Sequence, residues 1–522
     1  MNKSNLINLT ILGVAILGFL GFTSNYFGWT IDDGFITFRY SDNLANGFGF
    51  SWNYDETQEF GFTSYLHTIL VAFGIILGTD AIIFSKFLTI SASIATLILS
   101  GLLLRELTNN SFKFYYIPSL ALGLMPFLAV HSISGLETSL FVSLFSLSAF
   151  LYLRYLRDKT YAYLILTNIS ILFCTFTRYE GILLMLGIFV HQLFISKICK
   201  MKIDFRHLLF LFIPLIFLLS LLSWNYLQFG QPLPNPFYVK SAIVFSDIVR
   251  NINVISQMFI FVIPFVLLAF LNLKNNFKNI ATSYFIIQIV VAIIPFIFIN
   301  QWINYFYRYY FHVIPILVTL GIFSFYSIKD KIVFGKYSKI FLIIIIMLIV
   351  SYNIPTNWKV KEFTAYQEDY LESNHIKIGK ILGNYEELNK NFIATVVDAG
   401  AMPYYSKWKA YDYVLNDKYV IQHGFDADRF YSFEPKLIIF DSSFGGLADI
   451  ASAELEKEYL LYLQKPQKGP TYEITVHPEF KNYKLLTFFS KQTIFVEKEF
   501  AEENPELMND LINASKSTRG TV

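Results

Sequence analysis

The sequence predicts a helical membrane protein that carries a soluble α/β region at its carboxyl end. Hydrophobic residues make up 54% of the 522 residues and charged residues only 15%, with 55 Phe and 34 Tyr. An average soluble domain contains roughly 25% charged residues. Long apolar stretches fill the chain up to about residue 355, and charged and polar residues dominate after it. The net charge of +2 gives no reason to expect a nucleic-acid partner.

Apolar stretches that could cross a membrane recur through the first part of the chain. The first one follows a lone Lys3 and has no small-residue cleavage signature after it, so we interpret it as a retained span. We expect about eleven spans in all. They lie near 6–23, 82–104, 114–131, 137–153, 161–177, 181–196, 208–227, 254–272, 280–299, 309–327 and 339–354.

The stretch "SYLHTILVAFGIILG" at 64–78 decides the topology. If it crossed the membrane, the basic clusters after it would face outward, against the positive-inside rule. We therefore expect 64–78 to be a juxtamembrane helix within a first external loop at about 24–81, with the N-terminus in the cytoplasm. The clusters concerned are Arg154/Arg157/Lys159, Lys197/Lys200/Lys202/Arg206, Lys274/Lys278 and Lys329/Lys331/Lys336/Lys339.

With this topology the polar stretches of the membrane part meet at its external face. They are "TIDDGFITFRY", "HSISGLETSLF", "TRYEGIL", "FGQPLPNPFYVK" and "NQWINYFYRYY". A transporter or flippase would place ionisable groups near mid-membrane and would show internal repeats, and we find neither in the sequence. The pattern favours a site at the membrane surface, with transport as the alternative.

Two adjacent acids, Asp32 and Asp33, follow the first span. With Thr30 they fit a capping box at the start of a helix that runs to about Asn46. Neighbouring side chains in a helix diverge by about 100°, so one acid can cap while the other faces a substrate.

The other charged residues of this face also have structural interpretations. Glu137 fits the acidic residue of a helix N-terminus. Arg178 and Glu180 are as consistent with an ion pair lining a cavity as with catalysis. Arg308 fits an anchor in an aromatic belt, together with Trp302.

After about residue 355 we expect an external α/β domain at 356–502. "FIATVVDAG" and "PKLIIFDSS" are typical of buried strands that end at Asp398 and Asp441, and "KLLTFFSKQTIFVEKEF" of a hairpin. A helix is expected at 450–464. Asp398 stands where such sheets bind ligands, although an Asp that caps the next helix fits the same position. We expect the tail, 503–522, to be disordered.

Taken in order and spacing, several of these segments resemble the membrane glycosyltransferases of the GT-C superfamily. The branch most similar is that of the terminal arabinofuranosyltransferases of mycobacterial cell-wall synthesis. The resemblance covers most of the chain and is strongest in the first external loop. It is carried by "DDGFITFRYSDNLANGFGFSWN", "FGFTSYL", "SGLETSLF", "TRYEG", "PLPNPFYVK", "WINYFYRYYFHVIP" and "VVDAGAMPYYSKWKAYDYV".

The resemblance implies a catalytic acid and a juxtamembrane helix in the first external loop, and a sugar donor carried on a polyprenyl phosphate. The family's less variable first acid maps onto Asp32, which is our preferred base. Two segments depart from the family. Arg-Pro-Glu-Gly is replaced here by Arg178-Tyr179-Glu180-Gly181, and Glu-Gly-Tyr-Thr by Phe60-Gly61-Phe62-Thr63, which removes a carboxylate.

The chemistry of such a transfer assigns roles to the remaining candidates. A base must take the proton of the acceptor hydroxyl, and cations must hold the departing phosphate. We predict Asp32 and Asp33 as catalytic residues. One base with direct displacement would invert the anomeric centre. The predicted phosphate-binding residues are Arg178, Lys240 and Arg308, and the predicted substrate-binding residues are Arg39, Asn53, Glu137, Glu180, Trp302 and Asp398.

We thus expect a GT-C-type glycosyltransferase, hexosyl or pentosyl, in the cytoplasmic membrane of a bacterium. Its donor would be a polyprenyl-phosphate sugar and its acceptor an external cell-envelope glycan or glycolipid. No cofactor is certain, and a divalent cation among Asp32, Glu137 and Glu180 stays open as a possibility.

Overall fold

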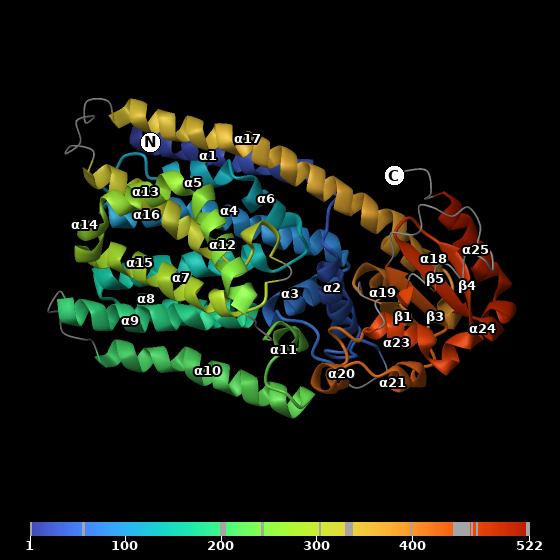
Figure 1. Cartoon of the computed structure of the whole chain (residues 1–522). Helices are drawn as coiled ribbons and strands as arrows, with labels where there is room; N and C mark the ends of the chain where they lie inside the picture. Colours follow the sequence, from blue (N-terminus) through green and yellow to red (C-terminus); the bar gives the residue numbers. More distant parts are fainter. Residues whose placement is uncertain are drawn as a thin grey trace.

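The structure is a computed structural model of the chain (Figure 1). It describes residues 3–54, 58–198, 205–241, 245–301, 304–328, 338–396, 399–441, 460, 463–465 and 468–517. Within these ranges the side chains of 3, 198, 205–209, 240–241 and 338–352 are not described. The helices of the first part lie side by side in one bundle, and the strands gather at one end of it (Figure 1).

The bundle is built from apolar helices, as the sequence predicts. Among the described residues, seven helical segments are long and apolar enough to cross a membrane, or eight if one bent pair forms a single span. The long helices are α1 (Lys3–Asn25), α4 (Ala81–Leu107), α7 (Thr138–Asp158), α9 (Leu183–Ile198), α10 (Phe205–Phe229), α15 (Ile280–Ile293) and α16 (Ile314–Ile328). The bent pair, α12 (Phe245–Phe261) and α13 (Ile263–Leu271), turns by 84° at its break.

Three predicted spans take other forms. The stretch at 114–131 is divided between α5 (Ile117–Gly123) and α6 (Pro126–Ile133), because proline favours the first turn of a helix and disrupts its interior. The stretch at 161–177 is the 17-residue α8 (Tyr161–Thr177). The stretch at 339–354 is the first half of α17 (Ser338–Leu371). The predicted helical membrane architecture is confirmed. Among the described residues, the stretches at 114–131 and 161–177 form helices shorter than a full span.

Two helices lie between α1 and α4. They are α2 (Asp32–Ala45) and α3 (Tyr65–Ile76), and α3 packs against both α2 and α4. The hydroxyl of Ser64 caps α3 by accepting a hydrogen bond from the His67 amide at 3.3 Å. Its 12 residues make α3 about 18 Å long, too short for a bilayer core of about 30 Å. The predicted position of 64–78 along the membrane surface stays a prediction.

The carboxyl end contains a five-stranded mixed sheet in the order β2-β1-β3-β5-β4. β1 (Phe392–Val396) pairs in parallel with β2 (Lys409–Tyr411) and β3 (Leu437–Asp441). β4 (Tyr483–Phe488) and β5 (Gln492–Glu497) form an antiparallel hairpin, and β5 joins β3. The two predicted strands and the hairpin are confirmed. Most of the predicted helix at 450–464 lies outside the described residues.

Short helices surround this sheet and connect the spans. In the membrane part these are α11 (Asn235–Ser241) and α14 (Leu273–Lys278). Around the sheet they are α18 (Lys377–Gly383), α19 (Ala401–Ser406), α20 (Lys418–His423), α21 (Ala427–Ser432), α23 (Pro470–Val476), α24 (Lys498–Glu503) and α25 (Pro505–Lys516).

The prediction of a disordered tail at 503–522 is wrong for its described part. Residues 505–516 form α25, which buries Leu507, Met508 and Leu511 in the apolar cluster beneath the sheet. These residues recur at helical spacing, so the segment gains enough apolar burial to offset the entropy of ordering it.

The predicted domain boundary near residue 355 falls inside a continuous helix. α17 spans 34 residues, contains Pro355, and leads through a π-helical turn at Glu372–Ile376 directly into α18. Figure 1 shows α17 running along the bundle beside α1 and on toward the sheet. The change from apolar to polar residues at 355 therefore does not mark the end of a helix. It marks the point at which α17 passes from apolar to polar surroundings.

Candidate active site

A cavity of about 320 Å³ opens where four of the predicted external stretches meet. Its volume is at the lower end of the roughly 300–1,000 Å³ typical of small-molecule sites. Most of its wall is aromatic or proline, and its charged groups are two arginines and two glutamates. The lining residues are Thr63, Glu137, Arg178, Tyr179, Glu180, Pro234, Pro236, Phe237, Pro295, Phe296, Phe298, Ile299, Arg308 and Tyr309.

Arg178 lies at the break between α8 and a 3₁₀ turn at Tyr179–Ile182. The turn packs tightly on α8, because a Cβ at Gly181 would overlap the backbone of Cys174. The guanidinium of Arg178 contacts Glu137 Oε1 at 3.2 Å and Glu180 Oε1 at 3.1 Å. The ion pair that the sequence suggests for Arg178 and Glu180 is present, and Glu137 adds a second carboxylate.

Arg308 follows a strained turn. Phe306 and Tyr307 have φ angles of 49° and 61°, in the left-handed region that costs a side-chain-bearing residue roughly 1–2 kcal/mol. Three hydrogen bonds brace the turn: His131 Nε2 contacts the Phe306 carbonyl at 3.1 Å, and the Asn304 side chain both accepts from the Tyr309 amide at 3.2 Å and donates to Gln301 at 2.7 Å. Strain of this kind concentrates at ligand sites, where surrounding contacts maintain it.

The guanidinium of Arg308 has free hydrogen-bond donors at the cavity. Its Nε and Nη1 atoms are buried and have no hydrogen-bond partner among the described residues. The ring of Tyr309 separates the two arginines, with its centroid 5.3 Å from Cζ of Arg178 and 5.2 Å from Cζ of Arg308. Arg178 is neutralised by two carboxylates. Arg308 has buried N–H groups that an anion would satisfy.

Asp32 and Asp33 begin α2, and the helix ends next to Asn46, as predicted. The predicted capping box is absent, because no side chain caps α2. Asp32 instead binds the C-terminal region. Its Oδ2 accepts a hydrogen bond from the Gly400 amide at 2.9 Å, and its Oδ1 accepts one from the Ala401 amide at 2.8 Å.

Asp33 has a different neighbour. It is half-buried and lies close enough to Arg308 for an electrostatic interaction. The adjacent acids thus face separate partners, as the divergence of neighbouring helical side chains predicts. The carboxylate of Asp32 joins two parts of the fold, and that of Asp33 lies within electrostatic range of Arg308.

Two predicted substrate-binding residues, Arg39 and Asn53, do not line the cavity. Arg39 is buried and donates to the carbonyls of Trp52 and Trp408, each at 2.8 Å, and to the carbonyl of Pro403. It also donates to Asn53 Oδ1 at 3.0 Å, and Asn53 Oδ1 in turn accepts from the Ala410 amide at 2.9 Å. These contacts fasten the segment between α1 and α4 to the C-terminal region.

The remaining predicted residues lie outside what the structure describes. The side chain of Lys240 and the whole of Trp302 and Asp398 fall in undescribed positions, so their predicted roles stay predictions. Among the described residues, no group of three or more His, Cys, Asp or Glu side chains is placed to hold a metal ion. Asp32 does not join Glu137 and Glu180, which both bind Arg178.

Sequence reasoning missed Tyr309 and the wall formed by Phe237 and Phe296. Tyr309 belongs to the aromatic run "NYFYRYY", in which no local signal distinguishes the ring between the two arginines from its neighbours. Phe237 lies in a proline-rich segment and Phe296 directly follows Pro295; proline restricts the backbone without indicating which neighbouring side chain faces inward.

No family model and no curated protein match this chain. Its structure matches that of ArnT from Cupriavidus metallidurans bound to undecaprenyl phosphate. The TM-score is 0.61 and the identity 9%, over 95% of this chain and 98% of that one. It also matches the archaeal oligosaccharyltransferase AglB from Archaeoglobus fulgidus in complex with an inhibitory peptide and a dolichol-phosphate. That TM-score is 0.56 and the identity 11%, over 88% of this chain and 71% of that one. The chain therefore shares the overall fold of these two proteins.

Proposed function

We propose that the protein is a glycosyltransferase that moves a sugar from a polyprenyl-phosphate donor to a glycan or glycolipid at the external face of a bacterial cytoplasmic membrane. One observation carries the proposal. Arg308 lines a cavity with aromatic walls, and its buried Nε and Nη1 atoms have no hydrogen-bond partner among the described residues. A carboxylate, Asp33, lies within electrostatic range of that arginine. An anion, an apolar chain and a reacting hydroxyl each have a complementary group there.

The donor phosphate would bind Arg308. A planar guanidinium matches two phosphate oxygens at once, and such charge-assisted bonds are about twice as strong as neutral ones. The aromatic and proline wall offers an apolar surface to the first isoprene units beside the phosphate. Support comes from the two similar structures, since that of ArnT holds undecaprenyl phosphate and that of AglB a dolichol-phosphate.

The base is better assigned to Asp33 than to Asp32. The sequence favoured Asp32, but both of its carboxylate oxygens accept backbone hydrogen bonds from Gly400 and Ala401. A general base must reach the proton that it removes. Asp33 is adjacent to Asp32 on α2 and lies within electrostatic range of Arg308, where the phosphate would leave. Asp32 would then hold the C-terminal region in position.

The step follows from these positions. Asp33 takes the proton of the acceptor hydroxyl as that oxygen attacks the anomeric carbon. The bond between this carbon and the phosphate oxygen breaks, and the electron pair leaves on the phosphate, whose charge Arg308 stabilises. A single displacement of this kind inverts the anomeric centre.

The test replaces Asp33 by Asn in a strain that lacks the wild-type gene, followed by mass spectrometry of the envelope glycans. We expect the product to fall by roughly 10²–10⁴-fold, the usual contribution of a positioned base. Asp42→Asn is the matched control, because Asp42 also lies on α2 but forms an ion pair with Lys407 at 2.7 Å. An Asp33→Asn strain that builds the wild-type glycan would refute the assignment. Translocation of labelled lipid-linked sugar in proteoliposomes tests the transporter alternative.

A further inference from the structure

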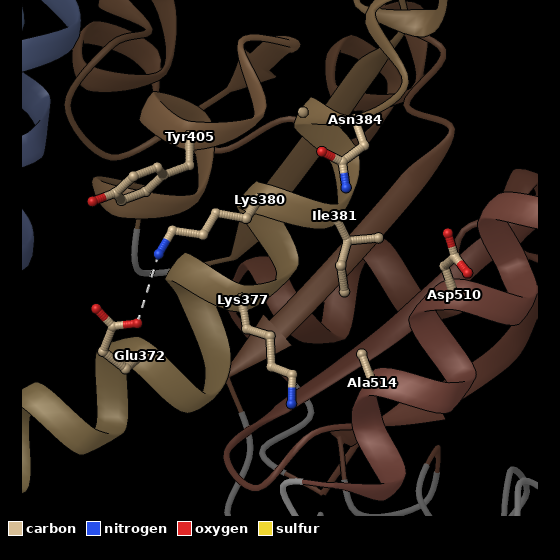
Figure 2. A pocket seen from close by; sticks show the side chains of 9 residues that line it. Glu372, Lys377, Lys380, Ile381, Asn384, Tyr405, Asp510 and Ala514 are labelled. Carbon is tan, nitrogen blue, oxygen red and sulfur yellow. Dashed lines mark ion pairs between the residues drawn. The ribbon is translucent and has the colours of Figure 1, made fainter.

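A second cavity, of about 840 Å³, lies in the C-terminal region (Figure 2). Its floor is one face of α18 and the residue after it. Lys377, Lys380, Ile381 and Asn384 follow one another at i, i+3, i+4 and i+7, so they lie on the same side of the helix. The opposite side buries Ile378 and Leu382 in the apolar core. The cavity thus exposes a polar helix face that no described element covers.

The charges around this cavity cancel. Lys380 Nζ lies 3.9 Å from Glu372 Oε2, a pair that Figure 2 marks with a dashed line. Lys377 donates to the hydroxyl of Ser517 at 2.5 Å, and Asp510 accepts from Tyr385 at 2.8 Å. Two lysines oppose two carboxylates, so the lining has no net charge with which to select an anion. Such alternating donors and acceptors suit an uncharged ligand that is rich in hydroxyl groups.

Two further groups extend this polar surface. Asn384 is exposed, and no hydrogen bond of its side-chain amide to another described residue is recorded, so that it offers both donors and an acceptor. Tyr405 reaches the cavity from α19, and its ring and the side chain of Lys380 lie beside each other in Figure 2. Burial and the nearby carboxylates of Glu372 and Asp80 raise the pKa of Tyr405 to about 12, so its hydroxyl stays a neutral donor.

The cavity is joined to the acids by a single short helix. α19 carries Tyr405 near its end, and the amides at and just before its start bind Asp32. Six residues of α-helix are about 9 Å long. In addition, the ring of Phe35, three residues after Asp32, lies 5.7 Å from the ring of Tyr405. A ligand at Tyr405 would therefore contact a helix whose other end binds Asp32, the neighbour of the proposed base.

We propose that the cavity binds uncharged saccharide units of the acceptor, next to the unit that receives the sugar. The inference rests on the proposed function, which it deepens by naming the class of acceptor and a binding surface for it. Lys377, Lys380, Asn384 and Tyr405 would bind hydroxyl groups, and Ile381 would contact the C–H surface of a sugar ring.

Ligand-observed NMR on the purified full-length protein in detergent tests binding directly. The probes are neutral fragments of glucan, mannan, galactan and arabinan, compared with inorganic phosphate and with phosphatidylglycerol vesicles. We expect at least one neutral oligosaccharide to bind at millimolar concentration or below, without competition from phosphate or vesicles. Failure of every neutral fragment to bind, or displacement of a bound fragment by phosphate or vesicles, would overturn the inference.

Variants locate the binding. Asn384→Ala combined with Lys380→Ala should weaken oligosaccharide binding roughly tenfold, as the loss of two hydrogen-bonding groups predicts. Lys390→Ala is the matched control, because Lys390 is exposed and does not line the cavity. Unchanged melting temperatures would show that the variants are folded. Equal affinity in the double variant and the control would place the binding elsewhere and reject this cavity.

The two proposals fail separately. Asp33→Asn should keep oligosaccharide binding, because Asp33 does not line this cavity. If oligosaccharides bind at the cavity but transfer does not depend on Asp33, the proposed mechanism fails. If transfer depends on Asp33 but no neutral saccharide binds, only the acceptor cavity is rejected.

Discussion

Arg178 and Arg308 flank the ring of Tyr309, but their charges have different surroundings. The side chain of Arg178 is only 9% exposed and is held by Glu137 and Glu180. Arg308 has buried N–H groups without a partner among the described residues. Removing a partner from a buried ion pair strands the other charge, whereas an unpartnered group is available to a ligand. The two arginines should therefore respond differently to substitution.

Arg178→Ala should lower stability. The change strands Glu137 and Glu180, at a cost of about 3–5 kcal/mol. We expect a lower melting temperature and a lower yield of purified protein. Arg105→Ala is the control, because Arg105 is exposed and its guanidinium donates to the side chain of Asn110 at 2.6 Å, a contact with a small net contribution to stability. An Arg178→Ala protein of normal stability that has lost only activity would make Arg178 a phosphate ligand instead.

Arg308→Lys should keep the fold and slow the reaction. Lysine keeps the charge but loses the planar fork that matches two phosphate oxygens. Because loss of one stabilising donor typically costs 10²–10³-fold in rate, we expect roughly a tenfold decrease when the charge remains. Single-turnover rates of the purified variant measure it, with Arg105→Lys as control, since Arg105 is exposed. If lysine substitutes freely, Arg308 is an anchor of the aromatic belt.

The sequence identified the charged residues near the cavity, but it did not show which residues each of them contacts. Gly400, which binds Asp32, lies 368 residues along the chain, so no local pattern connects the two. The strained turn before Arg308 could not be predicted from the sequence either. Left-handed backbone is normally predicted at Gly or Asn, whereas here it occurs at Phe306 and Tyr307. Residue type alone does not predict that Arg178 is paired with two carboxylates, or that Arg308 has N–H groups without a partner among the described residues.

At the scale of elements, α2 and α19 form the contact on which the site depends. α2 starts with Asp32 and Asp33. The backbone amides of Gly400 and Ala401, at the start of α19, donate hydrogen bonds to the carboxylate of Asp32. The approach is so close that a Cβ on Gly400 would overlap the backbone oxygen of Asp32. This contact and those of Arg39 and Asn53 join the segment between α1 and α4 to the C-terminal region.

Gly400→Ala should therefore move α19 away from Asp32. We expect faster hydrogen exchange at the amides of α19 and a lower transfer rate, with the spans unaffected. Gly21→Ala in α1 is the matched control, because no atom lies within 4 Å of the Cβ that it would add. Unchanged exchange in α19 would show that the contact with Asp32 relaxes at no cost.

Apolar composition and periodicity were sufficient to predict the spans, β1, β3 and the hairpin, since these elements are defined by local pattern. Two expectations failed for physical reasons. The tail forms α25 because Leu507, Met508 and Leu511 find a partner surface on the sheet. The change in hydropathy at 355 predicted a domain boundary, but it lies within α17. Hydropathy indicates what surrounds a helix and does not indicate where the helix ends.

At the scale of the whole molecule, the distribution of basic residues predicts which face of the bundle is external. Both proposals require the acids, the cavity with Arg308 and the sheet to lie on the same side of the membrane. The contacts of Asp32, Arg39 and Asn53 with the C-terminal region hold the first external loop against the sheet. If the sheet is external, the loop and the site are external with it.

Cysteine labelling in intact cells tests this orientation. In a Cys199→Ser background, Lys390→Cys should react with a membrane-impermeant maleimide, because Lys390 is exposed in the C-terminal region. Thr160→Cys, exposed between α7 and α8 on the predicted cytoplasmic side, should react only after the cells are opened. The opposite pattern would invert the topology. Cys174 is buried and should not react in either case.

The continuity of α17 restricts how the chain can change length over evolutionary time. Its 34 residues form a rod about 51 Å long. Inserting or deleting one residue in this rod would rotate everything beyond it by about 100° and shift it by 1.5 Å along the axis. Such a rotation would move α19 away from Asp32. Loops elsewhere in the bundle can absorb insertions, so descendants of this gene should differ in loop length while keeping α17 free of single-residue gaps.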